Sequence, residues 1–390
     1  MYPEVQTYFK QKKKLHDTLL TYLEENEELE FKFQSLSDSK KEDFEKFLDL
    51  LTYISNNHTK TDEFSNKIGR ILLNYKRKIK QTFSNSELLN IFESNKLILL
   101  FLLKNQFIVV DDLYNQYKNV ADMCHFFFPE IKQKLDDQKA QQIEEELLEK
   151  DSNIFDNFEE KRKIGENDSY ICTLIRYDSI QEFISYVTQS NFCLTSKIEP
   201  SIFETNQFLN DNQPTLIEYA AFFGSIKVFN YLRMAGVDLT PSLWLYSVHS
   251  NQATMIHLLE TLHIQPPDNS YNSCLLEAIK CHHNNIALYI LNNLIVEKDS
   301  LLYEKIDDCC MRYSNYSCFY DESTGNDAFF YYCKCNSVNI VDIGFEKEKD
   351  EIEKFIIWKQ IVIYKIPKKA KFWMIFQKSL SFNNICKDIF

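Results

Sequence analysis

The N-terminal part of the chain repeats apolar residues at intervals of three and four positions. In residues 44–54 these apolar positions fall on one face of a helix, which predicts an amphipathic helix. Ser39 and Glu42 precede that series with the spacing of a capping box, in which a serine hydroxyl and a glutamate carboxylate satisfy free backbone amides at a helix start. Ser84 and Glu87 have the same spacing before a second apolar series. Both stretches therefore predict helix starts.

The rest of the chain also favours helices over strands. Beyond residue 168, prolines separate segments that have helical spacing, and only residues 360–366, QIVIYKI, alternate as a strand would. Residues 141–168 are acidic and less periodic, so we expect a helix there, followed by an exposed connector between two domains. The sequence predicts an all-α fold.

Residues 215–238, TLIEYAAFFGSIKVFNYLRMAGVD, contain two of the six glycines of the chain. Short helical patterns lie before and after Gly224. Ala220 and Ala221 are small enough to let two helices approach closely. Gly224 and Gly236 permit the positive φ angles of a tight turn and of a helix end. The stretch therefore predicts two antiparallel helices joined at Gly224.

The same arrangement recurs along the chain. Asn251 takes the place of Gly224 after twenty-seven residues, His282 does so after a further thirty-one, and Asn336 after a further fifty-four, which is twice twenty-seven. Residues 176–187 look like an earlier, divergent copy, and residues 95–109 look like the second helix of a more degraded one. We expect antiparallel helix pairs across residues 170–294, with turns near Gly224, Asn251 and His282.

These residues resemble the ankyrin repeat. Thr215 and Ile217 stand where that family has the threonine and leucine of its opening motif, and Gly224, Leu232 and residues 236–238 match its later positions. The chain is similar to the divergent, Phe/Tyr/Asn-rich ankyrin proteins expanded in some protist genomes, in which a helical part precedes the repeats. Because the spacing falls short of the family's usual repeat of about 33 residues, we expect short loops in place of its β-hairpins.

The resemblance implies an α-solenoid preceded by a helical module. We expect a helical N-terminal domain at residues 1–150, with degraded repeats inside it as an open alternative, and an acidic connector at residues 151–168. Degenerate ankyrin repeats would follow at residues 169–345, and an irregular tail at residues 346–390.

The composition of the chain excludes several classes of function. A net charge of -13 argues against a general nucleic-acid surface, because binding phosphates needs cationic patches. With six glycines, the chain contains neither a dinucleotide-binding glycine motif nor a phosphate loop. It also lacks a run of about eighteen apolar residues and an apolar secretory signal, and its 11 cysteines are most simply reduced thiols. We expect a cytoplasmic protein with no membrane span, no nucleic-acid partner and no cofactor.

The histidines and cysteines of the second half raise the possibility of a zinc site. The residues concerned are His282, His283, Cys309, Cys310, Cys318, Cys333 and Cys335. Neither adjacent cysteines nor a C-x-C pair has the usual zinc-knuckle spacing, and several of these residues fall on repeat positions. We therefore expect buried thiols that act as small apolar side chains, and no stoichiometric zinc.

The first helices of the repeats are the predicted partner surface. In register, they present Tyr219, Phe222 and Phe223, then Tyr246, His249 and Ser250, then Glu277, Lys280 and Cys281. Tyr219 and Phe222 are the best anchor candidates, because large aromatic side chains dominate many interfaces. The alternative is that Phe222 or Phe223 packs against a neighbouring helix.

The sequence analysis favours a non-catalytic scaffold or adaptor that binds an unidentified protein. One alternative is an enzyme with a metal or acid/base site in the N-terminal part or in the cysteine-rich region. Another is a poorly functional paralogue with a decayed C-terminus, because the last residues lose the repeat periodicity.

Overall fold

The computed structural model describes residues 3–24, 33, 36–58 and 61–318. Within the described residues, those from 13 to 318 belong to one compact unit. The described residues are all-α, as the apolar spacing predicts: they contain helices but no strand, and one isolated bridge joins Lys197 and Thr215. Among them, no helix is both long enough and apolar enough to cross a membrane.

The helices before residue 165 pack around a first apolar core. They are α1 (Pro3–Glu24), α2 (Lys41–Asn57), α3 (Asp62–Asn74), α4 (Lys76–Thr82), α5 (Asn85–Ile91), α6 (Lys96–Lys104), α7 (Val110–Tyr117), α8 (Ala121–Phe126), α9 (Phe128–Ile131), η2 (Lys132–Lys134), α10 (Asp137–Lys150) and α11 (Phe158–Ile164). Phe44, Phe47 and Leu51 of α2 are buried in this core, as the apolar face of residues 44–54 predicts.

One of the two predicted capping boxes is present. The Ser84 hydroxyl accepts a hydrogen bond from the Glu87 amide at 3.3 Å, and the Glu87 carboxylate accepts one from the Ser84 amide at 2.9 Å. The prediction for Ser39 is wrong, because α2 is capped at Lys40 without a side-chain hydrogen bond. The Ser39 hydroxyl instead donates to the Leu36 carbonyl at 2.7 Å, so it is not available to the helix start.

The acidic segment also differs from the prediction of an exposed connector. It contains the helix α11, which places Phe158 and Arg162 four residues apart on one buried face. Arg162 has no exposed surface, and its two terminal nitrogens donate to the carboxylate of Glu130 at 2.6 and 2.7 Å. The amphipathic helix was not predicted because most of its residues are charged.

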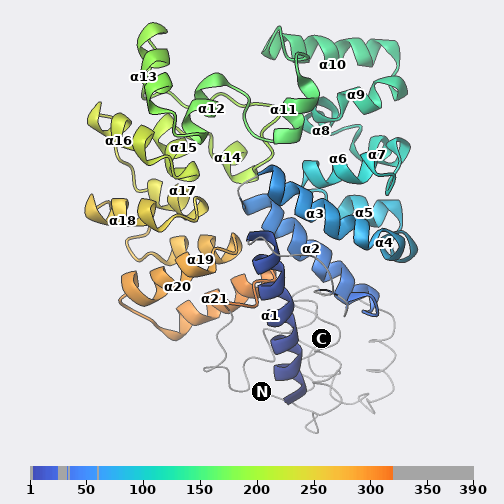
Figure 1. The fold of residues 1–390 in the computed structure, drawn as a ribbon, viewed down its shortest axis with the longest axis horizontal. Helices are drawn as coiled ribbons and strands as arrows, with labels where there is room; N and C mark the ends of the chain where they lie inside the picture. Colours follow the sequence, from blue (N-terminus) through green and yellow to red (C-terminus); the bar gives the residue numbers. More distant parts are fainter. Residues whose placement is uncertain (1–2, 25–32, 34–35, 59–60, 319–390) are drawn as a thin grey trace, which may run out of the picture. The chain divides into compact units, whose positions relative to one another are not determined.

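The helices from residue 170 onward form a second core. They are α12 (Tyr170–Arg176), α13 (Ile180–Gln189), α14 (Gln207–Asn212), α15 (Leu216–Phe223), α16 (Ile226–Met234), α17 (Leu243–His249), α18 (Ala253–Thr261), α19 (Asn272–Lys280), α20 (Asn284–Tyr289), the π-helix η3 (Ile290–Leu294) and α21 (Ser300–Arg312). The helices α12, α15, α17, α19 and α21 pack one against the next, and α13, α16, α18 and α20 each pair with the helix before them (Figure 1).

The turns inside these pairs share one backbone conformation. Gly224, Asn251 and His282 have φ angles of 68°, 53° and 61°, and each separates two helices at the position that the spacing predicts. Twelve residues after the first two turns, Gly236 and His263 have φ angles of 87° and 54°. Positive φ at these points ends one helix and lets the chain reverse.

A further turn of this kind follows α21. Ser314 has a φ angle of 58° and lies thirty-two residues after His282. The repeat spacing predicts the next turn at Asn336, which lies outside the described residues. Ser314 was not predicted because Cys310 and Met311 stand where the best copy of the repeat has alanines.

Candidate functional site

The predicted partner residues do not form an open surface on this chain. Tyr219, Phe222, Tyr246, His249 and Ser250 are buried, and Phe223, Glu277 and Lys280 are partly buried. The prediction that these side chains are exposed on the surface of the chain is therefore wrong.

The side chains that cover these residues come from α14, which lies outside the helix pairs, and from α12. The ring of Phe208 of α14 contacts three of the predicted partner residues: its centroid lies 6.2 Å from that of Phe222, 5.0 Å from that of Tyr246 and 4.3 Å from that of His249. The Tyr219 hydroxyl accepts a hydrogen bond from Arg176 at 3.0 Å. The repeat spacing predicted correctly which helices carry these residues. It could not predict that α14, in the insertion between α13 and α15, covers them, because hydrophobic periodicity carries no information on such tertiary contacts.

Helices of the N-terminal part pack against the same region. His16 of α1 lies 2.9 Å from His282, nitrogen to nitrogen, and the ring of His58 lies 4.9 Å from that of His283, centroid to centroid. With His249 these residues form a buried group that we call the histidine seam. The chain has 8 histidines, so the seam gathers most of them.

The seam histidines are held in their neutral form. Burial lowers the pKa of His16 to about 3 and that of His58 to about 4. Burial also lowers the pKa values of His282 and His283 well below their usual range, and neighbouring histidines lower them further. Two opposing effects act on the pKa of His58: burial lowers it, and a hydrogen bond with the backbone of Cys281 raises it, but the loss of solvation is the larger effect.

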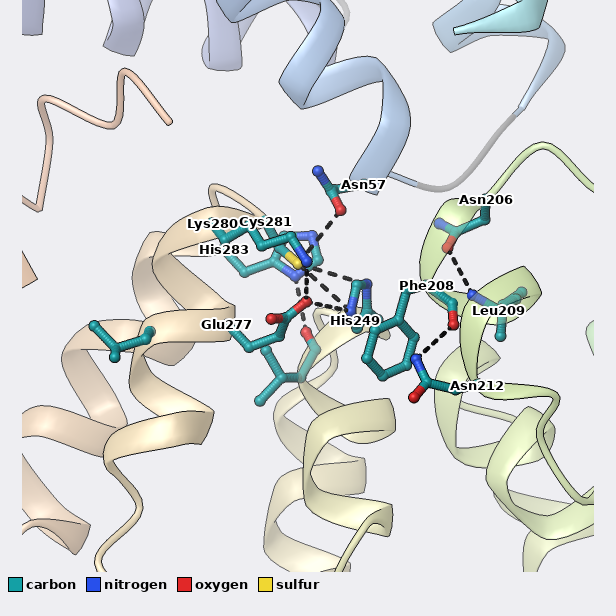
Figure 2. A network of polar contacts seen from close by, with 12 residues as sticks. Asn57, Asn206, Phe208, Leu209, Asn212, His249, Glu277, Lys280, Cys281 and His283 are labelled. Carbon is teal, nitrogen blue, oxygen red and sulfur yellow. Dashed lines mark hydrogen bonds and ion pairs between the residues drawn. The ribbon is translucent and has the colours of Figure 1, made fainter. Parts of the chain in front are cut away.

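One group within this region combines three kinds of metal-ligating side chain. His249 ends α17, Glu277 lies in the last turn of α19, and Cys281 follows four residues later on the same face. His249 Nε2 lies 3.0 Å from Glu277 Oε1, and Cys281 Sγ lies 3.4 Å from His249 Nδ1 and 3.7 Å from Nε2 (Figure 2). We call these three residues the His–Glu–Cys group.

The protonation states of the group follow from its surroundings. Burial raises the pKa of Glu277, but the hydrogen bond and charge of His249 and the charge of Lys280 outweigh it and lower the pKa to about 2. Burial lowers the pKa of His249, although Glu277 partly opposes this, and burial raises the pKa of the Cys281 thiol well above its usual range. At neutral pH the group therefore holds a carboxylate, a neutral imidazole and a protonated thiol.

A thiol, an imidazole and a carboxylate in this order resemble the parts of a cysteine nucleophile and its base. Nucleophilic catalysis needs an accessible thiolate. Cys281 is 0% exposed, and its raised pKa keeps it protonated. The geometry is therefore better suited to a structural or ligand-holding role than to catalysis.

The zinc candidates of the sequence analysis are not gathered into a site within the described residues. His282 contacts His16, His283 lies 2.8 Å from the Val248 carbonyl, and Cys318 donates to the Asn284 side chain at 3.0 Å. Cys309 and Cys310 are buried free thiols, and Cys333 and Cys335 lie outside the described residues. The His–Glu–Cys group was not predicted from the sequence, although the four-residue step from Glu277 to Cys281 is visible there.

A separate cavity of about 590 Å³ lies on the N-terminal part. Residues of α3, α6 and α11 line it, with Ile68, Leu72 and Phe101 among the apolar walls and Leu73, 46% exposed, at its edge. Gly69 lets α3 and α6 approach, because a Cβ atom there would lie 2.7 Å from the Phe101 ring.

Comparison with known proteins gives no relative for this arrangement. No protein-family model, no curated protein and no solved structure matches the chain.

Proposed function

We propose that this chain is an α-solenoid of ankyrin-type helix pairs that acts by binding another protein. The observation that carries the proposal is a hydrogen bond that recurs from turn to turn. The residue after each left-handed turn reaches back to the previous turn: Ser225 Oγ donates to the Ile175 carbonyl at 2.5 Å, and Asn315 Nδ2 donates to the Ile279 carbonyl at 2.8 Å.

The residues after the two turns between them also reach back to the preceding turn. Gln252 Nε2 donates to the Phe223 carbonyl at 3.4 Å, and His283 Nδ1 lies 2.8 Å from the Val248 carbonyl. Ser225, His283 and Asn315 thus contact the carbonyl three residues before the preceding left-handed residue, at spacings of about thirty residues. Gln252 also reaches back to the preceding turn, but it contacts the carbonyl directly before Gly224. Such recurrence is typical of repeats in which each unit packs only against its neighbours, and stacks of this kind usually serve as binding surfaces.

The partner surface that we propose is the cavity between α3 and α6. The first helices of the repeats are covered by the chain itself. The lining of this cavity is mostly apolar, includes the exposed Leu73, and encloses enough volume for side chains of a partner helix. Lys104 and Lys163 at its rim are paired with Glu159 and Asp62, so apolar contact rather than net charge would dominate.

The test is recovery of a partner from the native cell with three forms of the full chain. Leu73→Glu places a charge at the cavity edge. Leu148→Glu changes a similarly exposed leucine (41%) on α10, away from the cavity, and serves as the control. The proposal predicts a protein that is retained by the wild type and the control and lost with Leu73→Glu, at equal thermal stability. Equal retention by all three would contradict the cavity assignment.

The alternative that the chain is an enzyme has less support. The observation that most favours it is the His–Glu–Cys group, but the thiol of that group is fully buried and therefore not accessible to a substrate. The alternative of a decayed C-terminus concerns residues outside the described part of the chain.

A further inference from the structure

We propose that the His–Glu–Cys group binds one Zn²⁺ ion. This differs from the expectation drawn from the sequence, because that expectation rested on cysteine spacing. The fold brings together ligands from α17 and α19 that no cysteine motif joins. The inference does not depend on the proposed function.

The distances between the ligand atoms fit a tetrahedral ion. Zinc binds sulfur at about 2.3 Å and imidazole nitrogen or carboxylate oxygen at about 2.0–2.2 Å, so tetrahedral ligand atoms lie roughly 3.2–3.7 Å apart. His249 Nε2 lies 3.0 Å from Glu277 Oε1 and 3.7 Å from Cys281 Sγ, and one ligand atom from each residue lies within 4.8 Å of the others. Side-chain shifts of up to about 1 Å would bring all three ligand atoms into this range.

A fourth oxygen lies beside the group. Asn57, at the end of α2, has its Oδ1 atom 3.7 Å from Cys281 Sγ (Figure 2). An amide oxygen or a water molecule there would complete four-coordination. An ion so held would link Asn57 of α2 to α17 and to the end of α19.

The charge balance also favours a divalent ion. Binding Zn²⁺ replaces the thiol proton of Cys281, which leaves as one proton per ion, and the N–H of His249 moves to the ring nitrogen that does not bind. One thiolate and one carboxylate then neutralise the ion, which suits a buried site. Lys280 Nζ, 2.9 Å from Glu277 Oε1, is 31% exposed at its side chain and would stay at the solvent side of that carboxylate.

The experiment uses the full chain, stripped of metal and titrated with Co²⁺ as a spectroscopic probe of zinc sites. The wild type should bind one Co²⁺ per chain with a thiolate-to-cobalt absorption band and release it when Zn²⁺ is added. Cys281→Ser should abolish the band. Cys274→Ser is the matched control, since Cys274 is a fully buried thiol on the same helix but outside the group, and it should leave the band unchanged.

Glu277→Gln gives an independent readout, because it keeps the shape of the side chain and removes its charge. We expect it to weaken Zn²⁺ binding at least tenfold, with one zinc per wild-type chain found by elemental analysis. Absence of one-to-one Co²⁺ uptake by the wild type would overturn the proposal, as would a thiolate band that persists in Cys281→Ser.

Discussion

Lowering the pH from about 7 to about 5 should weaken the histidine seam, and His58 provides the clearest test. Its pKa in the folded chain is about 4, against an ordinary value of 6.5. Between these values the unfolded chain binds more protons than the folded chain, so the free energy of unfolding falls as the pH falls. At pH 5 the loss that His58 contributes is about 2 kcal/mol, since each pKa unit is worth about 1.4 kcal/mol.

Other groups titrate over the same range, so the test must be a difference between variants. Asp49 acts in the opposite direction: burial raises its pKa to about 7, so the folded chain gains stability from its protonation as the pH falls. Comparing wild type with His58→Gln at both pH values removes this background. His257→Gln is the control, because the His257 side chain is 59% exposed and lies outside the seam.

Urea unfolding, followed by circular dichroism, supplies the free energies. The wild type and His257→Gln should lose about 2 kcal/mol more between pH 7 and pH 5 than His58→Gln does. The reasoning fails if His58→Gln loses as much stability as the wild type, because His58 would then not be held neutral by burial.

Two further predictions concern the repeats, and both can be measured by urea unfolding. Gly224→Ala should cost more stability than Gly236→Ala. Both sites have positive φ, which costs a non-glycine residue about 1–2 kcal/mol. A Cβ atom at Gly224 would lie 2.3 Å from the Gln252 side chain, which would have to move and lose its hydrogen bond to the Phe223 carbonyl, whereas no atom lies within 4 Å of a Cβ atom at Gly236. Equal costs would contradict this. Tyr219→Ala should lower stability by about 3 kcal/mol, because the side chain is buried and bonded to Arg176, and a loss below about 0.5 kcal/mol would show that the residue is exposed in solution.

Local patterns in the sequence were enough to predict the helix pairs. Gly224, Asn251 and His282 could be aligned because apolar residues recur at the same distances from each of them, and these distances depend only on neighbours along the chain. The Ser84 capping box was predictable for the same reason. Ser314 was missed because its helix carries cysteine and methionine at the small-residue positions.

The candidate site depended on contacts between distant residues, which periodicity does not contain. Phe208 covers Tyr246, and His16 meets His282 across 266 positions of sequence. The His–Glu–Cys group joins α17 and α19, and the packing of these two helices determines how the His249 ring lies relative to the Cys281 sulfur. Exposure of the predicted partner residues was therefore the least secure part of the sequence analysis.

The most direct test of the proposed function is the affinity of a recovered partner for the full chain, measured by calorimetry. The account predicts that Leu73→Glu weakens binding at least tenfold, or about 1.4 kcal/mol, while Leu148→Glu binds as the wild type does. Equal affinities for the wild type and both variants, at equal thermal stability, would contradict binding at the cavity between α3 and α6.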